Sequence, residues 1–177
     1  MAGQPADVLP AELLRALDDE RLDATDHSAY LLVTTDPGGE PRISMLSAGE
    51  VIACDEQSLR VALWQGTRTA ANLARGGTAL FGMVVPGRVV YVRTEPSRLL
   101  VPEAADLECF ELTVTGVKSD THAGMPVTSG ITFRVEERDR AATVAAWQRQ
   151  RELLTRAGRS KASGSSSGHG TRGQQSH

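Results

Sequence analysis

Short β-type runs joined by glycine- and proline-marked turns dominate this sequence from Ser28 onward. The runs are rich in aromatic and β-branched residues, and turn residues such as Pro86 and Gly87 separate them. Folds that alternate strands with helices need a helix between most strands, and these connections are too short for one. The sequence therefore predicts a mainly β fold, an antiparallel Greek-key split β-barrel with short flanking helices. The expected strands are 29–34, 42–47, 50–54, 59–64, 78–85, 88–94, 109–117 and 129–136.

Three helices are expected beside these strands. Leucines at helical spacing predict the first over about 10–18. Thr67 is a suitable N-cap for the second, which Gly76 and Gly77 should stop. The third is expected from about Arg138 to Arg156, with arginines near its C-terminal end.

The chain is expected to form one domain over residues 9–157. Residues 1–8 are expected to be a flexible N-terminus. Residues 158–177 are expected to be a disordered tail, because serine, glycine and glutamine bury little apolar area. The sequence shows no signal peptide, and no apolar run approaches the ~20 residues of a membrane helix. A soluble, cytoplasmic protein that does not bind membranes is expected.

Charge and cysteine content narrow the function further. The formal net charge is −3 and the pI is near 5.8, which argues against nucleic-acid binding but leaves room for a local site for one small anion. Cys54 and Cys109 are far apart, and we expect two buried thiols. No metal-binding motif is present, and no histidine, serine or cysteine can be assigned a catalytic role.

Two segments carry candidate binding residues. Arg42 and Ser44 share one face of an expected strand, while Ile43 and Met45 share the other. This pair indicates either a ligand-facing surface or a solvated strand face. The triplet 67–69, Thr-Arg-Thr, opens the second helix, where free backbone amides, hydroxyls and a guanidinium favour a phosphate. The alternative is a simple threonine cap followed by a solvated arginine.

The order of these segments resembles the pyridoxamine 5'-phosphate oxidase-like FMN-binding split-barrel family. That family typically shows a strand of the form R-x-x-x-hydrophobic, then a second strand, then a hydroxyl-plus-basic triplet that opens a helix ending in Asn-Leu. Here the corresponding segments are 42–46, 59–64 and 67–73, and the resemblance extends over roughly residues 9–154.

The resemblance implies that FMN is the cofactor. It further implies that Arg42 faces the phosphate or the pyrimidine side, and that Ser44 and the Met45 backbone line the isoalloxazine ring. By the same resemblance Leu63 and Trp64 flank the ribityl chain, while Thr67, Arg68 and Thr69 hold the phosphate. The family usually has lysine or arginine where Thr69 stands, so this site would have one positive charge fewer.

By the same resemblance, the protein is expected to be an oxidoreductase acting on a small organic molecule, and a homodimer with the cofactor in the interface. The arginine-leucine strand that ends pyridoxamine-phosphate oxidases is missing, which argues against that substrate. Two alternatives remain. One is a non-catalytic module for flavin or a haem-like ligand. The other is a reductase using a deazaflavin coenzyme, whose longer acidic tail would require a basic groove formed by Arg75, Arg88 and Arg93.

Overall fold

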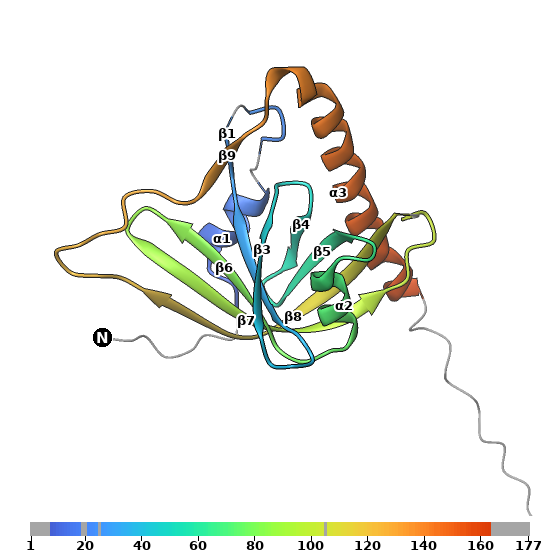
Figure 1. The fold of residues 1–177 in the computed structure, drawn as a ribbon, viewed down its shortest axis with the longest axis horizontal. Helices are drawn as coiled ribbons and strands as arrows, with labels where there is room; N and C mark the ends of the chain where they lie inside the picture. Colours follow the sequence, from blue (N-terminus) through green and yellow to red (C-terminus); the bar gives the residue numbers. More distant parts are fainter. Residues whose placement is uncertain (1–7, 19–20, 25, 105, 164–177) are drawn as a thin grey trace, which may run out of the picture.

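The structure is a computed structural model that describes residues 8–18, 21–24, 26–104 and 106–163 (Figure 1). The expected flexible N-terminus lies almost entirely outside these residues, and so does most of the expected tail.

The described strands form one large open sheet and one small sheet. The large sheet has seven antiparallel strands in the order β3-β2-β6-β7-β8-β5-β4, so β3 and β4 are its edges and it does not close into a full barrel. The expected mainly antiparallel split barrel is confirmed. Its strands are β2 (Tyr30–Thr35), β3 (Pro41–Leu46), β4 (Val51–Asp55), β5 (Ser58–Trp64), β6 (Ala79–Val85), β7 (Arg88–Leu99) and β8 (Leu107–Asp120).

The small sheet pairs two segments far apart in the sequence, β1 (Asp26–Ser28) and β9 (Thr132–Arg134). Sequence patterns indicated a longer last strand, 129–136, and did not indicate β1. An ion pair between Asp26 and Arg134 joins the two strands, with Nε and Oδ1 2.7 Å apart. Such short strands are defined by this pairing rather than by local propensity, which explains why β1 was missed.

The three helices are α1 (Ala11–Asp18), α2 (Arg68–Ala74) and α3 (Arg140–Ser163), the last preceded by a 3₁₀ turn at Glu137–Asp139. The bounds of α1 and α2 agree with the sequence. The third helix continues seven residues beyond its expected end at Arg156 and passes through Gly158, where the tail was expected to begin. One glycine inside a helix costs only about 1 kcal/mol, so it does not enforce a stop.

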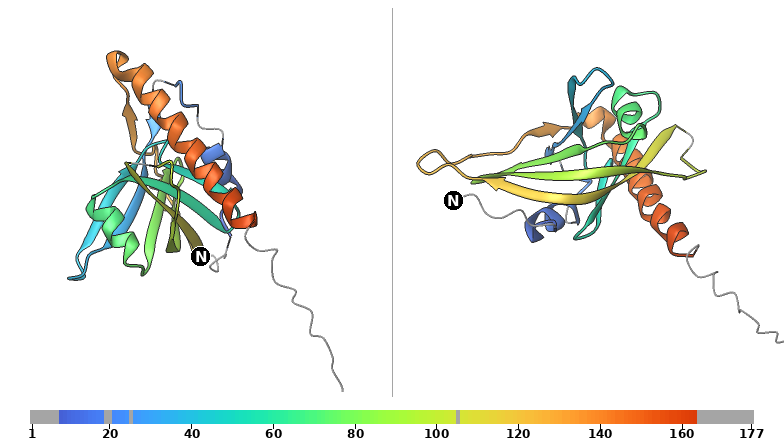
Figure 2. Two further views of the ribbon diagram at one scale, coloured as in Figure 1. Left: turned by 90° about the vertical axis from the view of Figure 1, so that its right-hand side faces the viewer. Right: turned by 90° about the horizontal axis from the view of Figure 1, so that it is seen from below.

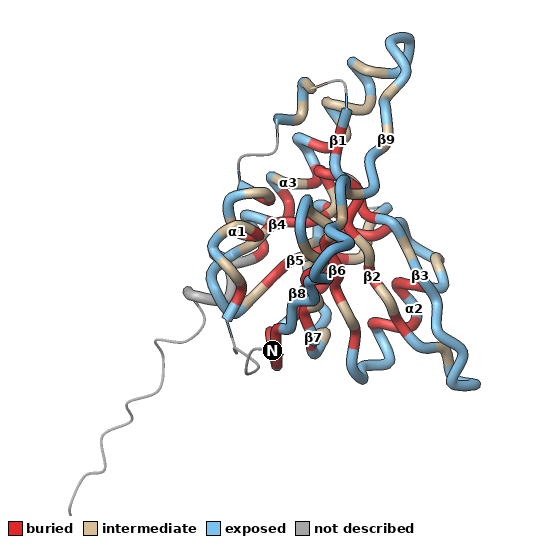
Figure 3. Tube along the Cα trace, turned by 90° about the vertical axis from the view of Figure 1, so that its left-hand side faces the viewer, coloured by how far each residue is buried: buried red, intermediate tan, exposed pale blue. Residues whose placement is uncertain are grey.

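The main core lies on the inner face of the curved large sheet, and buried positions follow the strands while the turns are exposed (Figure 3). Tyr30 and Phe81 stack there with ring centroids 5.8 Å apart. Leu13 and Leu17 enter this core from α1, and Leu73 enters it from α2. Because both helices contribute to the same core, the position of α2 is set by packing.

The long helix α3 crosses the outer face of the sheet over β4 and β5 (Figure 2). A second core forms there, in which Leu154 of α3 meets Ile52 and Ala62. Strand β5 is therefore buried on both faces. Its Leu59 and Val61 point into the main core and its Ala62 points toward α3.

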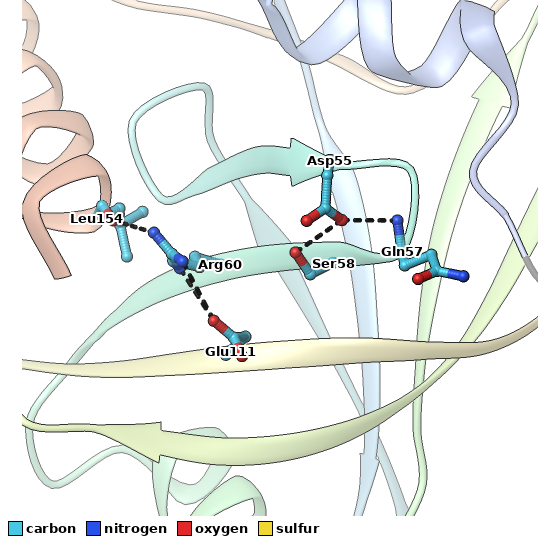
Figure 4. Close-up of polar contacts among 6 residues, drawn as sticks. All are labelled: Asp55, Gln57, Ser58, Arg60, Glu111 and Leu154. Carbon is cyan, nitrogen blue, oxygen red and sulfur yellow. Dashed lines mark hydrogen bonds and ion pairs between the residues drawn. The ribbon is translucent and has the colours of Figure 1, made fainter. Parts of the chain in front are cut away.

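Arg60 holds α3 to the sheet by polar contacts (Figure 4). Its Nε and Nη2 donate to Oε2 of Glu111 on β8 at 3.3 and 3.2 Å, and its Nη1 donates to the Leu154 carbonyl at 3.1 Å. Both charged side chains are mostly buried, with 12% and 15% exposure. A buried pair of this kind fixes the relative position of the elements that it joins.

Trp147 anchors the N-terminal half of α3 by apolar packing. It is buried, and its indole packs edge-on against His27 and Phe133 at centroid distances of 4.7 and 5.9 Å. Trp147 therefore docks α3 against the small sheet of β1 and β9. Gly49 allows the close approach, because a Cβ on Gly49 would lie 2.5 Å from the Trp147 Cα.

Gly49→Ala should lower stability, because the added methyl group overlaps the backbone of α3. Overpacking of this kind costs about 1–3 kcal/mol. Thermal unfolding followed by tryptophan fluorescence measures the effect. Gly116→Ala is the matched control, since a Cβ there meets nothing within 4 Å and its φ is not positive. Equal melting temperatures for the two variants would contradict this packing.

Candidate functional site

The start of α2 is organised as the sequence predicts. Thr67 is the N-cap, and its hydroxyl accepts a hydrogen bond from the Ala70 amide at 3.2 Å. Gly76 and Gly77, with φ of +82° and +96°, follow the helix and end it. Because α2 has only seven residues, its dipole is a weak source of attraction for phosphate. An anion at this place would depend on side-chain charge.

Strand β3 and helix α2 meet through a direct hydrogen bond between two of the predicted site residues. The hydroxyls of Ser44 and Thr69 lie 2.5 Å apart, and Thr69 is only 4% exposed. One hydroxyl proton forms this bond, so the other remains available to a ligand. Strand β3 and helix α2, which are separate segments of the sequence, are therefore in direct contact in the structure.

A second set of hydrogen bonds fixes α2 to β2. The buried Asn72 amide donates to the Thr34 hydroxyl at 3.0 Å, and the Asn72 carbonyl oxygen accepts from Arg75 at 3.2 Å. Arg75 also donates to the Thr35 carbonyl at 2.8 Å. The Asn-Leu pair that follows the triplet thus has a structural role, since Asn72 holds the helix to the sheet and Leu73 fills the core.

A cavity of about 680 Å³ opens between α2 and the β2–β3 turn. Arg42 enters it from β3, and Arg68 and Arg75 enter it from α2. The guanidinium groups of Arg42 and Arg68 form no ion pair or hydrogen bond with any other residue that the structure describes. We call this cavity the arginine groove. Two unpaired cations that line one cavity are suited to a doubly charged anion.

The groove also contains two carboxylates, Asp36 and Glu40. The Asp36 Oδ1 accepts from the amides of Gly38 at 2.8 Å and Glu40 at 3.0 Å, so this group is engaged in the turn. Three arginines against two carboxylates leave the lining with one net positive charge.

Of the predicted site residues, only Arg42 and Arg68 line the groove. Met45 is 65% exposed on the opposite face of β3, and Trp64 is 51% exposed at the end of β5. Leu63 is buried in the main core, which leaves only its backbone for a ligand contact. Thr67 is half-buried beside Arg68 and is used as the cap.

The basic groove expected for a deazaflavin is not formed. Of its three arginines only Arg75 reaches the arginine groove. Arg88 forms an ion pair with Glu12 of α1, and Arg93 lines a separate cavity on the outer face of the sheet. Within the single chain the three arginines are separated because β7 lies two strands away from β2.

Arg75 was not among the residues predicted to bind the FMN phosphate, although its spacing from Arg68 indicates it. Arg68 and Arg75 are seven residues apart, which places them two turns apart on one helix face. Helical periodicity over residues 68–75 would have assigned both arginines to one candidate site.

The outer face of the sheet continues the exposed side of β3. Ile43 and Met45, each 65% exposed, pair with Val33 and Leu31 of β2, and Leu80 of β6 pairs with Val33. We call these five residues the apolar face. Exposed apolar surfaces of this kind are typical of sites where another molecule binds.

The two cysteines differ in environment, and the expectation of two buried thiols is wrong for Cys54. Cys109 is buried between β5 and α3, and burial raises the pKa of its thiol to about 11. Cys54 is exposed near the end of β4, where a β-bulge shifts the register between Ala53 and Asp55. Desolvation raises the pKa of the Cys54 thiol, and the nearby Arg60 guanidinium opposes this.

Iodoacetamide should therefore modify native protein at Cys54 and leave Cys109 unmodified until the chain unfolds. Because the thiolate reacts and the raised pKa favours the neutral thiol, the Cys54 rate should keep rising above pH 9. The contribution of the neutral Cys109 thiol to the free energy of unfolding should be lost as the pH rises from about 9 towards 11. Peptide mass spectrometry checks the site. Equal labelling of both cysteines in native protein would contradict the burial of Cys109.

No family model matches the chain. Among individual proteins, the chain is 33% identical over 146 residues to the uncharacterized protein YclD of Bacillus subtilis, and the match covers 81% of this chain and 94% of YclD. This chain belongs to the same family as YclD.

Solved structures identify the fold. A Lactobacillus delbrueckii protein whose name places it with the pyridoxamine 5'-phosphate oxidases matches with a TM-score of 0.50 at 14% identity, over 66% of this chain and 98% of its own. An FMN-binding protein of Syntrophomonas wolfei matches with a TM-score of 0.48 at 15% identity, over 63% of this chain and 88% of its own. The predicted resemblance is confirmed at the level of fold, a pyridoxamine 5'-phosphate oxidase-like split barrel. None of the described helices is both long enough and apolar enough to cross a bilayer.

Proposed function

We propose that the chain binds FMN with its phosphate in the arginine groove and acts as an oxidoreductase on a small organic molecule. The observation that carries the proposal is the pair of unpaired guanidinium groups, Arg42 and Arg68, which converge from β3 and α2 on one cavity. The fold, which is that of the pyridoxamine 5'-phosphate oxidase-like proteins, supports the same ligand by resemblance.

The residues of the groove fit a phosphate monoester. A guanidinium offers two parallel N–H donors to phosphate oxygens, and two such groups match a dianion. Thr69 has a hydroxyl in place of the basic group usual at its position, and it is buried against Ser44. Arg75 enters the groove seven residues after Arg68 and offsets that missing charge.

The size and shape of the site also suit a flavin. The cavity volume of about 680 Å³ lies within the range of roughly 300–1,000 Å³ typical of small-molecule sites. Arg88 and Arg93 lie outside the groove, so it lacks the basic extension that a longer acidic coenzyme tail would require. FMN is thus favoured over a deazaflavin.

Bound FMN would supply the redox chemistry, and the chain would bind and orient it. Arg42 and Arg68 would neutralise the phosphate. The spare hydroxyl proton of the Ser44–Thr69 pair is placed to donate to a ligand atom beside β3. In this proposal the protein groups act on the orientation of the flavin and on the local charge around it.

Arg68→Ala should weaken FMN binding by about one to two orders of magnitude, because it removes a charge-assisted contact of about 1.5–3 kcal/mol. Arg42→Ala should have a similar effect. Flavin fluorescence quenching during titration measures the dissociation constant.

Arg21→Ala is the matched control, since Arg21 is an exposed arginine paired with Asp23 away from the groove. Unchanged affinity in Arg68→Ala, or failure of the wild type to take up FMN, would overturn the proposal.

Anaerobic addition of a reduced nicotinamide cofactor to the FMN-loaded protein distinguishes an enzyme from a binding module. Rapid bleaching of the flavin supports the oxidoreductase, and an inert bound flavin supports a non-catalytic binder.

We also propose that two copies of the chain associate through the apolar face, which borders the arginine groove at Ile43. Two-fold symmetry places the same patch on both partners, so a self-complementary apolar surface is sufficient. Covering this face would bury side chains that the single chain leaves in water.

Met45→Glu should convert the dimer to a monomer, because it places a charge within that interface. Met45 is 65% exposed in the single chain, so folding of the monomer should be unaffected. Light scattering after gel filtration gives the mass, expected at twice 18.9 kDa for wild type and at 18.9 kDa for the variant. A wild-type mass of 18.9 kDa would contradict the proposal.

A further inference from the structure

A separate hollow of about 160 Å³ lies on the outer face of the sheet over β7 and β8. Cross-strand pairing defines its four corners, because Tyr91 lies opposite Lys118 and Arg93 lies opposite Gly116. Leu80 of β6 pairs with Arg93 and closes one side. The hollow shares no lining residue with the arginine groove.

The floor of the hollow is Gly116. A Cβ added to Gly116 would meet no atom within 4 Å, so the missing side chain leaves open space opposite Arg93. The backbone does not require glycine here, since φ of Gly116 is not positive. The open space at Gly116 therefore exists only because glycine has no side chain.

A β-bulge beside Gly116 fixes the geometry of this corner. Arg93 pairs with Gly116 and Thr94 pairs with Val114, so Thr115 is the extra residue. The Thr115 hydroxyl donates to the Arg93 carbonyl at 3.3 Å and ties the bulge to β7. Bulges commonly redirect side chains next to functional sites.

Two cations flank the hollow without a counter-charge. Arg93 and Lys118 are diagonal neighbours across the strand pair, and like charges so placed repel each other. Within the described residues, neither side chain forms an ion pair or a side-chain hydrogen bond. None of the lining residues is acidic. An anion bound between Arg93 and Lys118 would relieve this repulsion.

We propose that this hollow binds a small carboxylate with an apolar body. Arg93 and Lys118 would hold the carboxylate, and Tyr91 and Leu80 would contact the apolar part. A volume of 160 Å³ lies below the roughly 300 Å³ of sites for drug-sized ligands, so the ligand is no larger than a single ring with its carboxylate. Leu80 belongs both to this hollow and to the apolar face, so the two are contiguous on the outer face of the sheet.

Benzoate is the probe for this site, and amide NMR of the full chain is the measurement. Benzoate should shift the amide resonances of 115–118, with a dissociation constant on the order of 1 mM, corresponding to about −4 kcal/mol. Arg93→Gln and Lys118→Gln should each weaken binding about tenfold, as expected for loss of one charge-assisted contact. Lys118→Arg should restore it.

Gly116→Leu tests the cavity without changing charge. The leucine side chain occupies the hollow, so benzoate binding should be lost while the dispersion of the spectrum, which reports folding, is retained. Arg68→Ala should bind benzoate as wild type does, which separates this site from the FMN proposal. The neutral isostere benzamide should bind at least tenfold more weakly than benzoate.

Three results would overturn the proposal. The first is wild-type affinity for benzoate in Gly116→Leu or in both glutamine variants. The second is equal binding of benzamide and benzoate. The third is the absence of any shift at 115–118, or shifts confined to residues of the arginine groove.

Discussion

The candidate site depends on the attachment of one short helix to the β2–β3 hairpin. Seven residues cannot form a stable helix alone, so α2 takes its position from its surroundings. This position is set by a hydrogen bond between the Thr69 and Ser44 hydroxyls, by bonds donated from Asn72 to Thr34 and from Arg75 to the Thr35 carbonyl, and by Leu73 in the core. The arginine groove exists because these contacts hold Arg68 opposite Arg42.

Most of the large sheet and the two shorter helices could be predicted from local patterns. Turn residues and strand propensity located β2 to β8, and the Thr67 cap with the glycines at 76 and 77 located α2. The face shared by Arg42 and Ser44 followed from strand alternation. These features are set by neighbours in the sequence, which is why a single sequence contains them.

Features that depend on distant partners were missed or placed wrongly. The strand β1 is stabilised by β9, more than a hundred residues later in the chain. The exposure of Cys54 depends on what packs around the end of β4, which the composition of the chain does not reveal. Arg93 was grouped with Arg75, although the sheet order places them on separate surfaces. Such errors arise wherever topology, rather than local propensity, decides which residues meet.

The two-sided burial of β5 links the ends of the chain. Its inner face packs in the core that α1 enters, and its outer face packs under α3, so the first and last helices are coupled through one strand. Arg60 on that strand also binds the Leu154 carbonyl. Loss of α3 would therefore expose the back of β5 to water and loosen the sheet next to its β4 edge. The amides of β5 should be the slowest to exchange with deuterium, and a nick near the C-terminal helix should weaken the sheet that carries the groove.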